Sequence, residues 1–156
     1  MLKFTTLKIG GSAEFLSEPN SIEELKQVLS WSKQNKLSCK IIGAGSNLLI
    51  SDGEIPGLTL CTRKIHGSNI NSSTGIIEAL GGESLPSLAR RAANAGLHGF
   101  EWAIGIPGTV GGGIVMNAGA QGGCIAERIL SAEVIPLSGG KSFCLNRKDL
   151  DFSYRS

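Results

Sequence analysis

The sequence has few of the residues from which metal centres are built. It contains 2 histidines, and its 4 cysteines, Cys39, Cys61, Cys124 and Cys144, lie 20 or more residues apart, with no C-x-x-C pair. Zinc sites in proteins are typically made from closely spaced Cys and His ligands, so we expect no metal site. We expect the cysteines to be small buried side chains of a protein in a reducing cytosol.

Long runs of charge and long apolar runs are also missing. Charged residues make up 18% of the 156 residues, the net charge is +2, and no cluster of Lys and Arg occurs, which argues against a nucleic-acid partner. The start "MLKFTTLKIGGS" lacks the apolar core of a signal peptide, and no window is long enough to span a bilayer. We therefore expect a soluble cytoplasmic protein without membrane contact, and no sequence feature indicates a partner protein.

Two common catalytic and nucleotide-binding motifs are absent. There is no G-x-S-x-G, because Ser12 has Gly10 before it but Glu14 after it, so a hydrolase is a poor interpretation. At 43–49 there is no G-K-[ST] of a Walker A loop. Gly43 and Gly45 form G-x-G, but Leu48 occupies the position of the third glycine in a dinucleotide fingerprint.

The first third of the chain predicts a small α/β lobe. A strand is expected at 13–19, and a helix at 21–37 begins with a capping box formed by Ser21 and Glu24. Extended runs follow at 39–45 and 47–51. Strand, helix and strand in this order are typical of an α/β unit.

The remaining sequence predicts a mixture of strands and helices. Strands are expected at 58–62 and 75–82 on either side of a polar turn at 67–75, and a helix at 84–96 begins at Ser84 and ends at Gly96. A hairpin is expected at 130–146, with Ser138, Gly139 and Gly140 near its turn. The chain as a whole is predicted to be α+β.

The first glycine-containing motif is "GAGSNLL" at 43–49. Successive backbone N–H groups in a tight turn can point into one concavity and bind an anion without a basic side chain. A glycine pair alone leaves a phosphate-binding nest and a plain turn both open. The candidate residues are Gly43, Ala44, Gly45, Ser46, Asn47 and Leu48.

The second motif is "GIPGTVGGGIVMNAGA" at 105–120, which holds six glycines and no charged residue. Glycine weakens helices and strands, so the run has either a packing role or a ligand-binding role. A tightly packed buried helix through Gly111, Gly112 and Gly113 is one explanation, but it predicts neither Pro107 before it nor Asn117 after it. Taken with the first motif, the run favours a planar cofactor that carries phosphate.

These two motifs, in this order and about sixty residues apart, with "FTTLKIGGSAEFL" before them and "FSYRS" after them, resemble the family of UDP-N-acetylenolpyruvoylglucosamine reductases. These are MurB-type flavoenzymes of peptidoglycan synthesis in cell wall formation. The resemblance implies the FAD-binding fold of vanillyl-alcohol oxidase and p-cresol methylhydroxylase, with FAD between two lobes. The expected lobes are residues 1–62 and residues 63–156.

The resemblance assigns cofactors and contacts. It implies FAD, with NADPH as hydride donor, and places the FAD diphosphate on residues 43–48. The segment lining the flavin and diphosphate contributes Gly105, Ile106, Pro107, Thr109, Gly112, Gly113, Asn117 and Gly119.

The implied reaction reduces the enolpyruvyl ether of a UDP-sugar to UDP-N-acetylmuramate. The family's catalytic arginine falls on Arg155, whose guanidinium would stabilise charge on the substrate, and Tyr154 lies beside it as a substrate-binding residue. The resemblance places the substrate lobe and the proton donor beyond Ser156, so we expect this chain alone to be inactive. The alternatives are another flavin oxidoreductase of the same fold and a non-enzymatic FAD-binding module.

Overall fold

The computed structural model describes residues 1–152. The chain divides into two compact units, which we describe separately. The first contains residues 1–65 and Ile135–Phe143, and the second contains His66–Val134 and the residues from Cys144 onward. This division places 135–143 with the first unit because Ile135 packs against its core. The functional lobes expected from the sequence, 1–62 and 63–156, stay a prediction.

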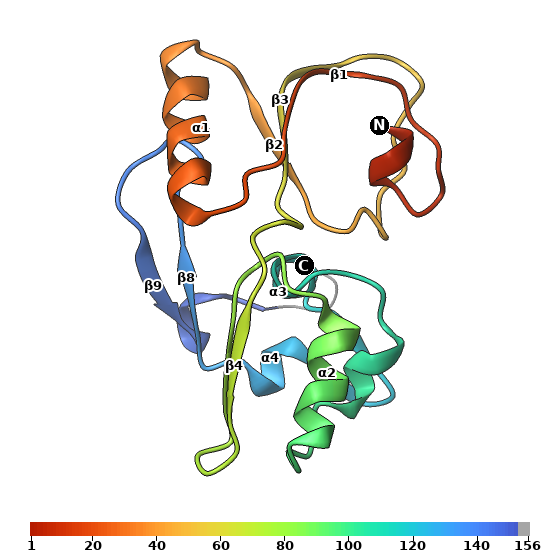
Figure 1. Cartoon of the computed structure of the whole chain (residues 1–156), viewed down its shortest axis with the longest axis vertical. Coiled ribbons are helices and arrows are strands. Elements are labelled where there is room, and N and C mark those ends of the chain that lie inside the picture. The colour runs from red at the N-terminus through yellow and green to blue at the C-terminus, as the bar shows by residue number, and fades with distance from the viewer. Residues whose placement is uncertain (153–156) are drawn as a thin grey trace. The chain divides into compact units, whose positions relative to one another are not determined.

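The first unit is a small α/β layer (Figure 1). Its elements are the 3-10 helix η1 (Leu2–Phe4), strand β1 (Ala13–Ser17), helix α1 (Ile22–Gln34), strand β2 (Cys39–Ile42) and strand β3 (Ile55–Cys61). The three strands form one sheet in the order β1-β3-β2, with both pairs parallel. β3 is therefore the central strand, although it comes last in the sequence.

Helix α1 covers this sheet through one apolar stripe. Leu25 and Leu29 of α1 pack against Leu58 and Leu60 of β3, and all four side chains are buried. Burying a leucine side chain contributes about 1.5 to 3 kcal/mol, so this layer stabilises the unit. The Ser21 hydroxyl accepts a hydrogen bond from the Glu24 N–H, which confirms the predicted helix start.

The second half of the predicted capping box at α1 is wrong. The Glu24 carboxylate accepts hydrogen bonds from the backbone N–H and the side-chain amide of Asn20, one residue before the cap. The backbone nitrogen of Asn20 lies 2.7 Å from a carboxylate oxygen of Glu24.

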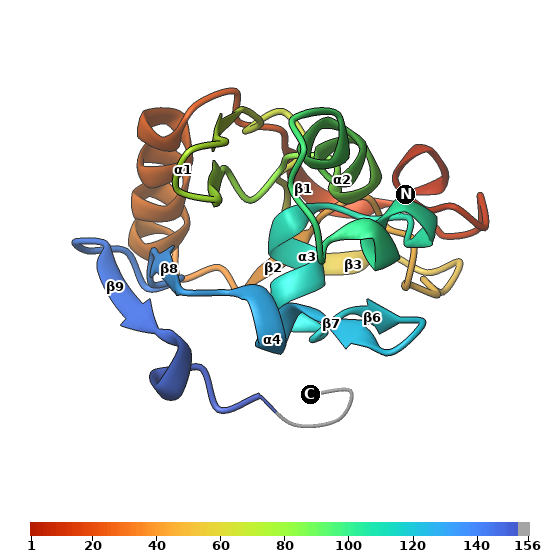
Figure 2. The same ribbon diagram turned by 90° about the horizontal axis from the view of Figure 1, so that it is seen from below.

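The second unit is a set of short elements around its own core. It contains β4 (Ser68–Asn71), β5 (Ile76–Ala79), α2 (Leu85–Asn94), η2 (Glu101–Gly105), α3 (Val110–Val115), β6 (Gly119–Ala120), β7 (Gly123–Cys124), α4 (Ile125–Arg128), β8 (Ser131–Val134), β9 (Phe143–Asn146, apart from its first residue) and η3 (Arg147–Asp149). The strands pair as β4-β5, β6-β7 and β8-β9. Figure 2 shows the β6-β7 hairpin beside α4.

The core of this unit lies between α2 and η2. Leu85 and Ala89 of α2 pack against Trp102 and Ala103 of η2 and against Ile125 of α4. The Ser84 hydroxyl accepts from the Ser87 N–H, so α2 begins where the sequence predicted. The predicted hairpin at 130–146 is confirmed by the pairing of β8 with β9.

Three sequence-based expectations need correction. Residues 47–51, expected as a strand, are irregular, because their backbone pairs with no strand of the sheet. The expected turn at 67–75 contains β4, which pairs antiparallel with β5. Of the four cysteines, only Cys61 is buried, and Cys144 is exposed.

Among residues 1–152, no helix has the length and apolar character to cross a membrane.

Candidate functional site

The loop after β2 has a backbone shape that requires glycine. Gly45 is buried and has φ +67°, a conformation that side chains other than glycine rarely adopt. A β-carbon at this position would overlap the carbonyl oxygen of Phe4. The carbonyl of Gly45 in turn accepts a hydrogen bond of 3.2 Å from the Thr6 N–H. The N-terminal segment therefore holds the loop in place from one side.

Several N–H groups of this loop find no acceptor in the part of the chain that the structure describes. Within residues 1–152, none of the backbone N–H groups of Ala44, Gly45 and Asn47 donates a hydrogen bond to a protein atom. Asn47 and Leu48 are exposed, whereas Gly43, Ala44 and Ser46 are partly buried. Close-set N–H donors around a glycine with positive φ are the feature of an anion-binding nest. The sequence left open whether this loop is a phosphate-binding nest or a plain turn, and these N–H groups favour the nest.

The second glycine run belongs to the other unit and lies against residues 81–85. Gly108 accepts a hydrogen bond from the Leu85 N–H, Val110 donates to the Glu83 carbonyl, and Gly111 donates to the Gly81 carbonyl. Thr109 is buried, and its hydroxyl accepts from the Gly112 N–H at 3.3 Å, so it caps α3. These bonds fix the run along the start of α2.

Five of the six glycines of this run fall into two groups. The first is packed against protein: a β-carbon at Gly111 would lie 3.0 Å from the Gly81 carbonyl oxygen, one at Gly113 would lie 3.3 Å from Leu85, and one at Gly119 would lie 2.7 Å from the Gly123 carbonyl oxygen. Helix packing, the alternative weighed at the sequence level, is therefore present in α3. It accounts for Gly111 and Gly113 without a ligand, and close packing within the β6-β7 hairpin accounts for Gly119.

The second group consists of Gly105 and Gly112. Both are exposed; a β-carbon at Gly105 would have no neighbour within 4 Å, and one at Gly112 would meet only the Thr109 hydroxyl, at 3.3 Å. Packing gives no reason for glycine at Gly105. Open backbone of this kind allows a flat ligand to approach closely.

The other candidate residues in this run differ in their burial and in their hydrogen bonds. Asn117 has φ +41°, and its side-chain oxygen accepts a hydrogen bond of 3.1 Å from the Ala126 N–H. Asn117 therefore holds the start of α4. Ile106 is partly buried in the core of the unit, and Pro107 is exposed.

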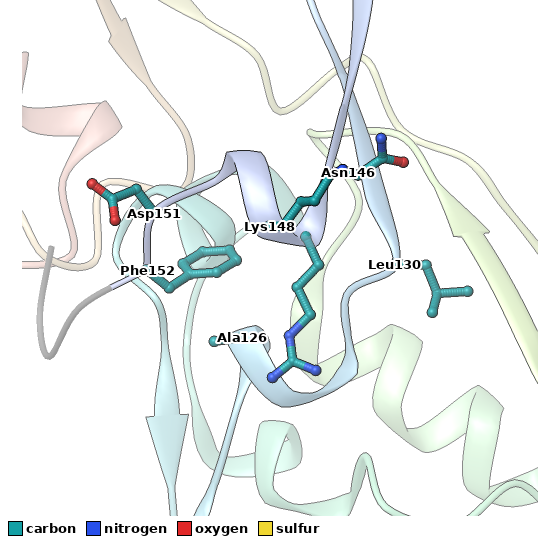
Figure 3. Close-up of a pocket in the computed structure, with 7 residues that line it drawn as sticks. Ala126, Leu130, Asn146, Lys148, Asp151 and Phe152 are labelled. Atoms are coloured by element: carbon teal, nitrogen blue, oxygen red, sulfur yellow. The ribbon is translucent and has the colours of Figure 1, made fainter.

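The two residues expected to contact substrate, Tyr154 and Arg155, lie outside the described residues. The chain just before them lines a hollow that sequence reasoning missed (Figure 3). This hollow of about 600 Å³ is formed by residues including Leu130, Arg147, Lys148 and Phe152. Among residues 1–152, none of the predicted site residues lines it. The adjacent Arg147 and Lys148 were the only sequence signal that pointed to this place.

Titratable groups of both units respond to local structure. Burial raises the pKa of the half-buried Cys39 thiol, which keeps it protonated. Hydrogen bonds from the backbone N–H groups of Glu101 itself and of Gly99 hold the pKa of the Glu101 carboxyl below its ordinary value, and the nearby His98 acts in the same direction. Neither group belongs to the two glycine motifs.

Comparison with known proteins gives one family match. The FAD binding domain family matches residues 13–143. Two UDP-N-acetylenolpyruvoylglucosamine reductases resemble the chain over 99% of its length. The one from Prochlorococcus marinus (strain MIT 9313) is 54% identical, and the chain covers 50% of it. The one from Parasynechococcus marenigrum (strain WH8102) is 57% identical, and the chain covers 52% of it. The chain spans about half the length of the curated relatives it matches.

Two solved structures resemble the fold. The crystal structure of UDP-N-acetylenolpyruvylglucosamine reductase from Thermus caldophilus is 30% identical with a TM-score of 0.74, and covers 99% of this chain and 53% of its own. The 6-hydroxy-D-nicotine oxidase from Arthrobacter nicotinovorans is 16% identical with a TM-score of 0.66, and covers 89% of this chain and 31% of its own. At that identity the second likeness concerns the fold alone.

Proposed function

Because this chain belongs to the family of FAD binding domains and FAD is therefore its cofactor, we propose that it forms the FAD-holding part of a cytoplasmic, NADPH-dependent UDP-N-acetylenolpyruvoylglucosamine reductase. The identities of 54% and 57% over nearly the whole chain support this assignment. The small-molecule partners are then NADPH and the enolpyruvyl ether of a UDP-sugar.

The observation that carries the proposal is the set of three N–H groups, those of Ala44, Gly45 and Asn47, that find no acceptor among the described residues. FAD contains a diphosphate, and the N–H groups of Ala44, Gly45 and Asn47 have no protein acceptor within residues 1–152. Such donors satisfy phosphate oxygens without a basic side chain. In this proposal Gly43, Ser46 and Leu48 complete the loop that holds the diphosphate.

The flavin side of the cofactor is proposed to lie on the open backbone of Gly105 and Gly112. Ile106, Pro107, Thr109, Gly113, Asn117 and Gly119 belong to the same proposed segment. Their role differs from that of the open glycines: Thr109 fixes the start of α3, and Asn117 fixes the start of α4. They hold the segment in one shape, so that a bound ligand need not order it.

The chemistry that FAD supplies when bound is hydride transfer from NADPH to the enolpyruvyl group. Arg155 is proposed as the catalytic residue that neutralises the carboxylate of this substrate, since a guanidinium is planar and always charged. Tyr154 is proposed to orient the same substrate. Both residues act on the substrate and not on the diphosphate loop, so their effects are separable from cofactor binding.

Two alternatives remain distinct. Another oxidoreductase of the same fold would bind FAD in the same loop but would not use the enolpyruvyl substrate. The likeness of the fold to 6-hydroxy-D-nicotine oxidase supports this alternative. A binding module without activity would hold FAD and never consume NADPH. Substrate-dependent consumption of NADPH by a protein that contains this chain separates both from the proposal.

The proposed diphosphate loop is tested by changing charge at Asn47, whose side chain is exposed. Asn47→Asp places a negative charge beside the phosphates and should weaken FAD binding by about 3- to 10-fold; Asn47→Lys should strengthen it by a similar factor. FAD affinity is measured by fluorescence titration of the 156-residue chain. Asn94→Asp, at an exposed position at the end of α2, is the charge-matched control.

The opposite signs of the two Asn47 variants separate electrostatics from misfolding. Damage to the fold would weaken FAD binding in both variants, whereas a nearby phosphate predicts opposite shifts. Equal affinities for all three proteins would place the diphosphate elsewhere and remove the proposed role of residues 43–48.

A further inference from the structure

A second hollow lies within the first unit, between α1 and the loop 135–140. Figures 1 and 2 both show this loop, which connects β8 to β9, beside α1. Leu29 forms part of the lining, and Ile135 packs against the same core. The rest of the lining comes mainly from Lys26, Ser30 and Lys33 of α1 and from Ser138 and Gly140 of the loop.

The two lysines are on one face of the helix. Residues 26, 30 and 33 follow the i, i+4, i+7 spacing, so their side chains lie one above another along α1. Within residues 1–152, neither ammonium group forms an ion pair, since the pairs in this part of the chain involve other cations. Two positive charges thus line one hollow without a counter-ion among the described residues, and an anion bound between them would offset their mutual repulsion.

Neutral donors line the same space. Ser30 and Ser138 carry hydroxyl groups, and the backbone N–H of Gly140 donates to no protein acceptor within residues 1–152. By contrast, the N–H of Gly139 is used in a bond of 2.9 Å to the Pro136 carbonyl, which closes the turn. The turn therefore contributes to the lining a residue whose N–H has no acceptor among the described residues, and α1 contributes two cations and a hydroxyl.

The size of the hollow limits the ligand. Its volume is about 160 Å³, a few times the roughly 30 Å³ that one water molecule occupies in the liquid. A tetrahedral oxyanion fits such a space and offers several acceptor oxygens to several donors at once. A large apolar ligand does not fit, and a metal cation would meet two ammonium groups and no carboxylate.

We propose that this hollow binds a phosphate group, held by Lys26 and Lys33 with the hydroxyls of Ser30 and Ser138 and the N–H of Gly140. The site is separate from the loop 43–48 and does not depend on FAD. A bound phosphate bridges α1 and the loop 135–140 and so stabilises the first unit by binding only its folded form. The phosphate can be a free ion or the monoester group of a metabolite, and both present the same oxygens.

The test is a titration of the 156-residue chain with inorganic phosphate, followed through the backbone amide signals in NMR. We expect saturable shifts at Gly140 and along α1 from residue 26 to 33. Replacing both lysines, in Lys26→Met with Lys33→Met, should weaken binding by about 10-fold or more, because each lost charge accounts for about 3- to 10-fold. Raising the NaCl concentration to about 1 M should weaken binding by screening.

The control variant is Lys3→Met, which removes an exposed lysine of η1 in the same unit and should leave phosphate binding unchanged. Arginine at positions 26 and 33 should retain binding, since it keeps both charges. A second titration with glycerol phosphate identifies the source: tighter binding of the monoester points to a metabolite, and tighter binding of inorganic phosphate points to the free ion. Unchanged affinity in the double methionine variant, or absence of saturable shifts with either ligand, overturns the proposal.

Discussion

The α-carbon of Gly45 faces the carbonyl oxygen of Phe4 so closely that a side chain at position 45 would overlap it. The conformation of Gly45, with φ +67°, adds backbone strain to any substitution. We predict that Gly45→Val destabilises the folded chain by about 1 to 3 kcal/mol from strain, with further loss from the overlap, and weakens FAD binding. Urea unfolding and FAD titration measure the two effects.

Gly53 provides the control for this substitution. It is exposed, and a β-carbon there would have no neighbour within 4 Å. Gly53→Val should therefore change neither the free energy of unfolding nor the affinity for FAD. A Gly45→Val protein that unfolds at the same urea concentration as the wild type would show that the loop adopts another conformation in solution.

The two groups of glycines in the second motif predict opposite phenotypes. Gly105→Ala adds a methyl group into open space, so it should leave stability unchanged while weakening FAD binding if the flavin lies on this backbone. Gly111→Ala brings a methyl group to 3.0 Å from the Gly81 carbonyl oxygen, so it should lower the midpoint of thermal unfolding. Scanning calorimetry with and without FAD measures both. A Gly105→Ala protein with normal FAD affinity would contradict the proposed flavin contact.

Thr109 caps α3, and its loss should be measurable in the chain without cofactor. Thr109→Val keeps the shape of the side chain but removes the hydroxyl that accepts from the Gly112 N–H. Loss of an N-cap hydroxyl destabilises a protein by about 0.5 to 2 kcal/mol. Thr109→Ser keeps the acceptor and should recover most of this stability in chemical denaturation. A Thr109→Val protein as stable as the wild type would contradict a stabilising role for this cap.

The pH dependence of stability should carry a contribution from Glu24. A hydrogen bond from the backbone N–H of Asn20, followed by one from the Asn20 side chain, holds the pKa of this carboxyl below its ordinary value of 4.5. The folded state therefore favours the ionised form, so the contribution is present above about 4.5 and is lost as the pH falls through the lower folded pKa. Glu24→Gln should melt below the wild type at pH 7 and show a smaller difference in acid.

Arg155 should act more strongly on the substrate than on NADPH in a reductase that contains this chain. Arg155→Lys keeps the charge but loses the planar geometry with two donors that matches a carboxylate. Reduction of the enolpyruvyl substrate should slow by about 10² to 10³, the usual effect of one preorganised contact. Consumption of NADPH with an artificial electron acceptor should be largely retained. Equal slowing of both rates would assign Arg155 to NADPH binding or to folding.

Local sequence was enough to predict the helix starts and the hairpin. Ser21 and Ser84 lie at the N-caps of α1 and α2 because a hydroxyl at that position bonds an N–H within the next turn, an interaction that spans three residues. The two motifs also carried the family, and the FAD-binding fold that they implied is supported by the solved structures it resembles.

Interactions between distant residues were not predictable in this way. The run 47–51 has strand composition, but a strand needs a neighbour, and β3 takes the central place between β1 and β2 instead. The hollow beside α1 likewise joins residues about a hundred positions apart in the sequence.

The amino-acid sequence by itself determined where glycine is placed, where the helices begin and which family the chain belongs to, because these depend on residue identity and short spacing. Only the tertiary structure decided what each glycine is for. A β-carbon at Gly45 would overlap the carbonyl of Phe4, one at Gly111 would crowd Gly81, and one at Gly113 would crowd Leu85. A β-carbon at Gly105 would have no neighbour within 4 Å among the described residues. The physical reason is that a glycine is needed where another atom approaches its α-carbon, and the folded chain determines which atoms approach.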